Sequence, residues 1–310
     1  MSNGGFEEQV RQDFDRARQK VFLHDLLSVF ARRSNHLIPY HEVSRRLSPE
    51  RESYRGLQTV ELAKIVGSMD RFDDFDRAYL PRQRHTAGRW QNVDRAYYQD
   101  RQLPPIQLYQ VGDVYFVKDG NHRVSVARER GQEFIDAEVI EGHVRAPLYA
   151  SMRPEELLLQ AEYAEFLRRT DLDKLQPDHD IRPTSLGRYD EIWEQIEGHR
   201  RWLEAIRHEP VPSQVGVADW YEYIYCPIVE VARERGVMGH FPKRTEADIY
   251  LWVMRHRGEL ERRLGHDLGP AASAEDYAEH VSPWRGLLPR LGRVVWGMLR
   301  RGSGRPPSGS

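Results

Sequence analysis

The spacing of apolar residues divides the chain into helical flanks and a short middle region rich in strand patterns. Apolar residues recur every three to four positions over Phe6–Arg33, which predicts a long amphipathic helix, and a second short helix is expected at His41–Leu47. Helical spacing returns from residue 147 onward. Only residues 103–141 have short β-branched and aromatic runs separated by turn residues. This pattern predicts an α+β protein.

The middle region predicts two strands joined by a tight turn, followed by a helix and a final strand. Gly112 and Asp113 form a dipeptide typical of hairpin turns. Gly131 stands just past the expected helix, where glycine commonly ends one. The expected elements are strands at Ile106–Tyr109, Val114–Val117 and Phe134–Ile140 and a helix at His122–Arg130.

The junction Asp119–Arg123 carries the most informative chemistry. A strand that turns directly into a helix leaves the first backbone N–H groups unpaired, and these groups attract anions, above all phosphate. Gly120 allows close approach, and Arg123 offers a planar charged fork that suits phosphate oxygens. His122 could donate a hydrogen bond or move a proton, and Asp119 could cap the helix, hold a metal ion or act as a base. Such residues also occur at helix starts that bind nothing, so spacing alone leaves both interpretations open.

The segment PPIQLYQVGDVYFVKDGNHRVSVARERG resembles the core of the ParB/sulfiredoxin superfamily. In that family a strand leads through a glycine turn into a short basic helix whose start holds nucleotide phosphates. The turn is Gly-Glu-Arg-Arg in CTP-binding ParB proteins, Gly-Cys-His-Arg in sulfiredoxin and Asp-Gly-His-His-Arg in an archaeal free serine kinase. The Asp-Gly-Asn-His-Arg of this chain is closest to the kinase form. The resemblance covers residues 54–145, under a third of the chain, and Val60–Ile65 resembles the first strand of that fold.

The resemblance implies a small mixed α/β domain that binds a nucleotide (CTP, ATP or ADP), with Mg²⁺ as an accompanying ion. The implied nucleotide contacts are Ser68 and Arg71 in the loop after the first strand, and Gly120, Asn121, His122 and Arg123 at the junction. The hypothesis has two conditions. The junction must not be filled by neighbouring side chains, and Arg123 must not turn away into an internal ion pair.

An acidic segment, Gly67–Pro81, contains the first of the two implied contact regions. Its carboxylates, among them Asp73 and Asp74, could hold Mg²⁺ beside a nucleotide, because Mg²⁺ prefers oxygen ligands and phosphate partners. The alternating acids and arginines equally suit a structural ion-pair cluster. The following stretch, Thr86–Tyr98, predicts a helix whose Trp90 faces the core.

Charge and cysteine content narrow the function classes. The net charge of −2 provides no global basic field for nucleic acid. The single cysteine, Cys226, leaves no internal disulfide or cysteine metal cluster and suits a cytoplasmic setting. Asn121 stands where sulfiredoxin needs its nucleophilic thiol, and Cys226 lies in an apolar run interpreted as core, so sulfiredoxin-type redox repair is not expected. Histidines at 199, 208, 240, 256 and 266 lack the spacing of a zinc motif, and no metal is assigned to them.

Residues 147–283 predict an all-helical domain. It resembles a bacterial domain of unknown function across DWYEYIYCPIVE and FPKRTEADIYLWVMRHR, a resemblance that implies no activity. The expected helices are Glu155–Arg169 after Pro154, Glu191–His208, Trp220–Arg235, and Glu246–Leu264 opened by Thr245 or Pro242. The expected domains are a helical arm at 1–53, the ParB/sulfiredoxin-like domain at 54–146, the helical domain at 147–283, and a basic amphipathic segment with a disordered tail at 284–310.

The N-terminal arm and the C-terminal segment suggest possible partners. The N-terminal arm could form a homodimer or simply pack on the next domain. Residues 284–301 alternate apolar residues with arginines, a pattern that suits an anionic membrane surface or a protein groove, or a helix that closes the domain.

Three function classes remain. The first is a regulatory switch driven by nucleotide binding. The second is a phosphotransferase that acts on a small hydroxylated molecule, like the serine kinase relatives, with Asp119 or a carboxylate in 70–76 as base and His122 as a further catalytic candidate. The third, a DNA-binding regulator, ranks last, because the chain has no helix-turn-helix pattern and no basic stripe in its body.

Overall fold

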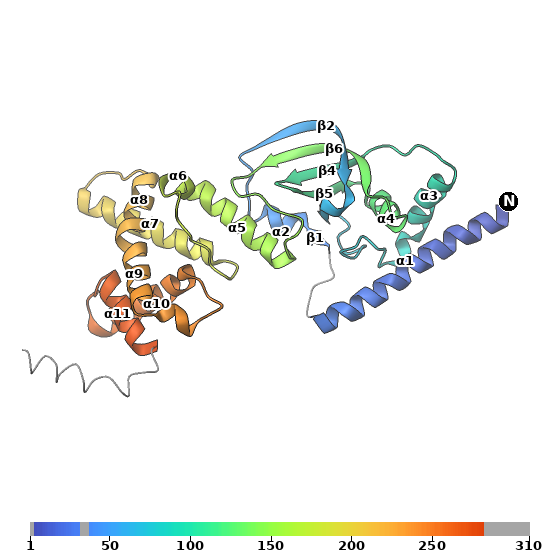
Figure 1. Cartoon of the computed structure of the whole chain (residues 1–310). Helices are drawn as coiled ribbons and strands as arrows, with labels where there is room; N and C mark the ends of the chain where they lie inside the picture. The colour runs from blue at the N-terminus through green and yellow to red at the C-terminus, as the bar shows by residue number, and fades with distance from the viewer. Residues whose placement is uncertain (1–2, 32–36, 282–310) are drawn as a thin grey trace, which may run out of the picture. The chain divides into compact units, whose positions relative to one another are not determined.

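A computed structural model describes residues 3–31 and 37–281. The chain forms two compact units, residues 1–169 and 170–310, and each is described by itself (Figure 1). The amphipathic segment predicted at 284–301 lies outside the described residues. Over the part of the chain that is described, no helix combines the length and apolar character needed to cross a membrane.

The first unit is built on a six-stranded mixed sheet, which makes the protein α+β as predicted. The strand order is β1-β3-β5-β4-β6-β2, with β4 antiparallel to β5 and parallel to β6. The outer strand β2 runs antiparallel to β6, and β3 runs parallel to β1 and β5. The strands are β1 (Ile38–Pro39), β2 (Arg51–Glu61), β3 (Ile65–Ser68), β4 (Ile106–Val111), β5 (Val114–Asp119) and β6 (Phe134–His143).

The three predicted middle strands, the hairpin and the following helix are confirmed. Gly112 turns the hairpin at a φ of 61°, and α4 (Asn121–Glu129) follows β5 directly. The interpretation of 60–65 as a single strand is wrong. There β2 ends at Glu61, a 3-10 turn covers Leu62–Lys64, and β3 begins at Ile65. The turn arises because β2 and β3 pair with different neighbours in the sheet.

Helices complete the core of the first unit. The predicted long N-terminal helix is α1 (Asn3–Ala31), and the short one is α2 (Tyr40–Ser44). Phe14 of α1 packs 5.6 Å from Trp90 of α3 (Ala87–Tyr98), ring centroid to centroid. Trp90 Nε1 donates a hydrogen bond of 2.9 Å to Ser125 Oγ of α4, which fixes α3 beside α4 (Figure 1). These contacts place α1 in the core of the first unit.

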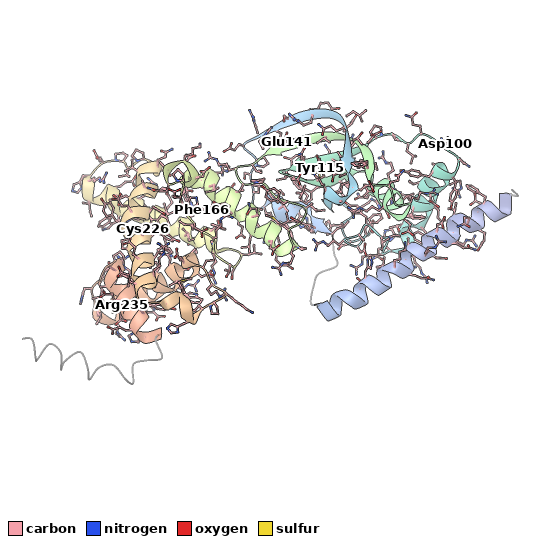
Figure 2. The ribbon with its side chains drawn as sticks, viewed as in Figure 1. Asp100, Tyr115, Glu141, Phe166, Cys226 and Arg235 are labelled. Carbon is pink, nitrogen blue, oxygen red and sulfur yellow. The ribbon has the colours of Figure 1, made fainter. Side chains whose placement is uncertain are left out.

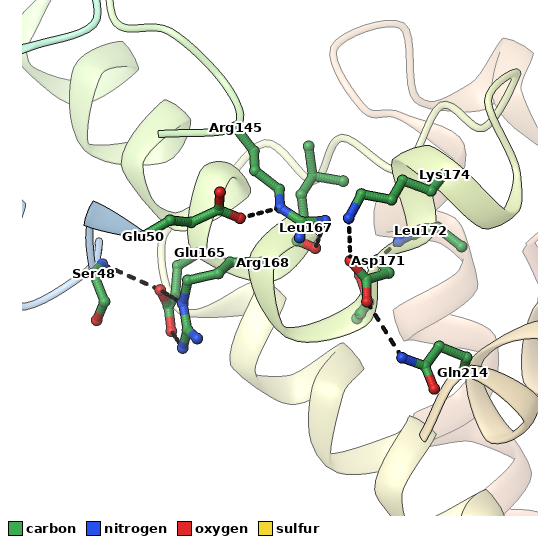
Figure 3. A network of polar contacts seen from close by, with 11 residues as sticks. Ser48, Glu50, Arg145, Glu165, Leu167, Arg168, Asp171, Leu172, Lys174 and Gln214 are labelled. Carbon is green, nitrogen blue, oxygen red and sulfur yellow. Dashed lines mark hydrogen bonds and ion pairs between the residues drawn. The ribbon is translucent and has the colours of Figure 1, made fainter. Parts of the chain in front are cut away.

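Helix α5 (Pro154–Thr170) extends the first unit beyond the boundary expected after residue 146. Glu165 accepts hydrogen bonds from the backbone N–H of Ser48, at 3.1 Å, and from Arg168 (Figure 3). Nearby, Arg145 donates to Glu50 at 2.6 Å and to the carbonyl oxygen of Leu167 in α5 at 3.3 Å. The composition change after residue 141 therefore marks the end of the sheet, whereas these polar contacts keep the next helix with it.

The second unit is all-helical over its described residues 170–281, as predicted. Its helices are α6 (Leu172–Leu175), α7 (Arg188–Arg207), α8 (Ser213–Trp220), α9 (Cys226–Glu234), α10 (Glu246–Leu264) and α11 (Pro270–Val281), with a 3-10 turn at Val237–His240. Thr245 caps α10 through a reciprocal capping box with Asp248, which confirms the expected start. Helix α11 was not predicted.

The helix expected at Trp220–Arg235 belongs to a longer rod of α8, a π-helical turn at Tyr221–Tyr225 and α9. Pro227 follows that turn and has no N–H to continue the regular ladder, which explains the wider turn before it. Cys226, labelled in Figure 2, is only partly buried, so its assignment to the packed core is wrong. Burial nevertheless raises the pKa of its thiol.

Candidate functional site

The strand-to-helix corner is shaped by Gly120. It lies between β5 and α4 with a φ of 108°, a conformation that side chains strongly disfavour. A Cβ atom at this position would lie 2.4 Å from Cγ2 of Ile106 on the neighbouring strand. No side chain caps the helix that starts here. The first amides of α4, which have no acceptor within the helix, are therefore left for an external group.

The corner opens into a cavity of about 430 Å³. This volume lies within the range of roughly 300–1,000 Å³ that small-molecule sites occupy. Residues 119–123, the segment Leu103–Pro104, and Arg71, Arg89 and Asn92 line it. The first condition of the sequence hypothesis, a corner not filled by neighbouring side chains, is therefore met.

Arg123 does not meet the second condition. Its Nη1 donates to the carbonyl oxygens of Pro104 at 2.5 Å and Pro105 at 2.8 Å, and its Nη2 pairs with the Asp119 carboxylate. The assignment of Arg123 as a free phosphate ligand is corrected. The cause is the irregular segment before β4, where the carbonyl oxygens of Pro104 and Pro105 lie outside any strand and accept hydrogen bonds from this guanidinium. Arg123 is a positioning residue that holds the loop before β4.

That loop separates two cavities. Leu103, Pro104 and Arg123 line both the corner cavity and a second one of about 490 Å³, which continues along Tyr97 and Phe134. The wall between them thus depends on the hydrogen bonds that Arg123 makes.

The positive charge of the corner cavity comes from Arg71 and Arg89. Arg71 follows β3 in the left-handed region at a φ of 40°, and its Nη1 lies 3.2 Å from the Asp74 carboxylate. Arg89 is an exposed residue of α3. Sequence reasoning missed Arg89, because only the packing of α3 beside α4 brings it to the corner. The sequence feature that could have identified it is its position next to Trp90, which places Arg89 outside the buried face of α3.

Two residues at the start of α4 have buried polar atoms without hydrogen-bond partners in the described part of the chain. They are Asn121, at its Oδ1, and His122, at both ring nitrogens. The His122 ring packs edge-on to Phe75, with centroids 5.3 Å apart. Burial, with smaller contributions from Arg71 and Arg89, lowers the pKa of His122 from 6.5 to about 4. His122 is therefore neutral at pH 7 and offers one donor and one acceptor.

Acid is expected to destabilise the wild-type protein more than a His122→Phe variant. Between pH 6.5 and about 4 the imidazole binds a proton in the unfolded state but not in the folded state. The contribution of the neutral ring to the free energy of unfolding is fully present above pH 6.5 and is lost as the pH falls from 6.5 to about 4. With a discount for partial exposure, we expect a difference of about 2 kcal/mol. Urea unfolding at about pH 7 and about pH 4.5 measures it, and parallel pH profiles for the two proteins would contradict it.

The other predicted site residues lie differently. Ser68 is fully buried, and its Oγ donates to the Val117 carbonyl at 3.3 Å, so it joins β3 to β5 and does not line the cavity. Asp74 pairs with Arg71 and, at 3.1 Å, with His85. Within the described residues, Asp73 and Asp74 belong to no group of three metal-ligating side chains. The ion-pair interpretation of the acidic segment is the better supported one.

Comparison with models of known protein families gives no match for this chain, and comparison with curated proteins gives no significant match.

Proposed function

We propose that the protein binds a nucleotide at the α4 corner and that this binding acts as a regulatory switch. The observation that carries the proposal is a single cavity that combines the uncapped first turn of α4 with the side chains of Arg71 and Arg89. Amides at a helix start together with arginines are a recurrent solution for phosphate. The motif resemblance of residues 54–145 to the ParB/sulfiredoxin-like fold points to the same ligand class.

The electrostatics of the cavity favour an anion. Arg71, Arg89 and Arg123 line it, and the one carboxylate among the lining residues, that of Asp119, is paired with Arg123. The phosphates would lie on the amides of Asn121 and His122, with Arg71 and Arg89 as counter-charges. The neutral His122 ring would donate one hydrogen bond to a phosphate oxygen without an ion pair.

The switch lies in the loop that carries Arg71. In the structure its guanidinium pairs with Asp74 of the same loop. A bound phosphate would compete for that guanidinium and release Asp74, which also pairs with His85. Ligand binding would thus exchange one ion-pair arrangement of the 69–81 loop for another, which is the differential interaction that a population shift requires.

Isothermal titration of the full chain with CTP, ATP and ADP, with and without Mg²⁺, tests the proposal. Arg89→Ala and Arg71→Ala are each expected to weaken nucleotide binding about tenfold or more, because each removes a charge-assisted hydrogen bond to phosphate. Arg84→Ala is the matched control. It removes the same charge from an exposed arginine near the start of α3 that does not line the cavity. Equal losses in all three variants, or no binding of any of the nucleotides, would contradict the proposal.

A phosphotransferase is the second candidate, favoured by the position of Asp119. Its carboxylate lines the cavity and is 68% exposed, so it can reach an acceptor hydroxyl. Turnover of bound nucleotide in the presence of a serine-like acceptor would distinguish the two functions. A transferase requires that Asp119→Asn abolish turnover while nucleotide binding is retained. A switch shows binding without transfer.

A further inference from the structure

The second unit contains a compact cluster of two histidines and one aspartate. His256 lies on α10, and Asp276 and His280 lie on α11. Nε2 of His256 is 2.7 Å from Oδ1 of Asp276, and Nδ1 of His280 is 3.1 Å from the same oxygen. We propose that His256, Asp276 and His280 bind a divalent transition-metal ion of the zinc type.

The geometry suits coordination of one ion. Within the described chain these side chains form a group in which each offers one ligand atom and all three atoms lie within 4.8 Å of one another. Bonds of about 2.0–2.1 Å to a tetrahedral ion place ligand atoms about 3.3 Å apart. The separations of 2.7 and 3.1 Å between the histidine nitrogens and Oδ1 of Asp276 are already close to that value. A metal ion would replace the proton in the hydrogen bond between His256 and the Asp276 carboxylate. It would also take Nδ1 of His280 from its present hydrogen-bond partner, the backbone carbonyl oxygen of Asp276 at 2.7 Å.

Helix geometry explains why the three side chains meet. Asp276 and His280 are four residues apart and therefore lie on the same face of α11. The rings of His256 and His280 have centroids 5.5 Å apart, and His256 packs edge-on to Tyr277 at 5.6 Å. The contact between α10 and α11 thus holds the three ligands in place before any ion arrives.

The ligand types select the class of metal. Two imidazoles and one carboxylate suit Zn²⁺ and its first-row neighbours, whereas Mg²⁺ and Ca²⁺ prefer sites built from oxygen. Three protein ligands leave a fourth position, which the following segment does not supply, because residues 282–310 contain no His, Cys, Asp or Glu. Water or an external ligand would take that position, as in zinc sites with three protein ligands. The side chains of His256, Asp276 and His280 are 19%, 31% and 49% exposed, so an ion can enter from solvent.

Titration of the full chain with Zn²⁺, and with Co²⁺ as a spectroscopic probe, tests the site. We expect one tight Zn²⁺ site and visible Co²⁺ absorption typical of tetrahedral coordination. His256→Ala and His280→Ala should each weaken Zn²⁺ binding about tenfold or more, since loss of a direct ligand is at least as damaging as loss of its supporting partners. Mg²⁺ should not compete.

His266→Ala is the matched control. It removes an exposed histidine just past the end of α10, outside the cluster, and should leave the Zn²⁺ affinity unchanged. Circular dichroism in the absence of metal checks that each variant folds, and Asp276→Asn serves as a conservative third variant should either alanine variant unfold. Unchanged Zn²⁺ affinity in the cluster variants, or the same loss in His266→Ala, would overturn the proposal.

Discussion

Replacement of Gly120 by alanine is expected to lower the unfolding free energy of the first unit by about 4 kcal/mol. Two separate effects add. The φ of 108° disfavours any residue with a side chain, and the new methyl group would lie 2.4 Å from Cγ2 of Ile106. Backbone strain of this kind and overpacking of a close contact are each worth about 1–3 kcal/mol. To relieve the contact, β4 or the start of α4 would have to move, which would also change the candidate site.

Gly131→Ala is the control for this prediction. Gly131 also has a positive φ, 72°, but an added Cβ would meet nothing within 4 Å, so only the backbone strain of about 1–2 kcal/mol applies. Trp90 is the single tryptophan of residues 1–169, so its ¹⁹F signal in fluorotryptophan-labelled protein reports urea unfolding of that unit alone. If both variants lose the same stability, the close approach of Gly120 to Ile106 is not important for stability.

Arg128→Met is expected to lower the unfolding free energy of the first unit by about 3–4 kcal/mol. The Arg128 side chain is partly buried, and its Nη2 donates to the carbonyl oxygens of Leu62 and, at 2.8 Å, Ile65. Its guanidinium carbon also lies 5.0 Å from the centroid of the Tyr79 ring. Methionine keeps the aliphatic stem but leaves both carbonyls without their donor at the turn between β2 and β3. Each orphaned buried acceptor is worth about 1–3 kcal/mol.

Arg95→Met is the matched control, because it makes the same chemical change at an arginine whose main partner, Glu7, is half exposed. Such a surface ion pair contributes about 0–1 kcal/mol. The ¹⁹F signal of Trp90 again measures the unfolding of the first unit. A loss in Arg128→Met no larger than that in Arg95→Met would show that the buried carbonyls find other donors.

Local chemistry made much of the fold predictable. The turn at Gly112, the β5–α4 junction at Gly120 and the helix end at Gly131 all follow from the conformations that glycine permits. Thr245 predicted the start of α10, because its hydroxyl and the Asp248 carboxylate accept hydrogen bonds from backbone N–H groups at the helix start. These signals act over a few residues, so they can be recognised without knowledge of the tertiary structure.

Long-range partners were not predictable in the same way. Arg123 lies in the predicted corner, but its direction is decided by two proline carbonyls 18 and 19 residues earlier in the chain. Arg89 reaches the cavity only through the packing of α3 against α4. His256 and Asp276 are 20 residues apart on different helices, so no motif spacing reveals that their side chains meet. Sequence reasoning therefore identified the strand-to-helix corner and the nearby Arg71, but neither Arg89 nor the histidine cluster.

Leu103, Pro104 and Arg123 form a wall shared by the two cavities of the first unit, so a change in the shape of one cavity would change the other. A ligand bound in either cavity would contact the wall that both cavities share. Occupants of the two cavities would therefore help or hinder each other, and thermodynamic reciprocity makes that influence equal in both directions. A compound bound beside Tyr97 and Phe134 would therefore change the α4 corner without contacting it.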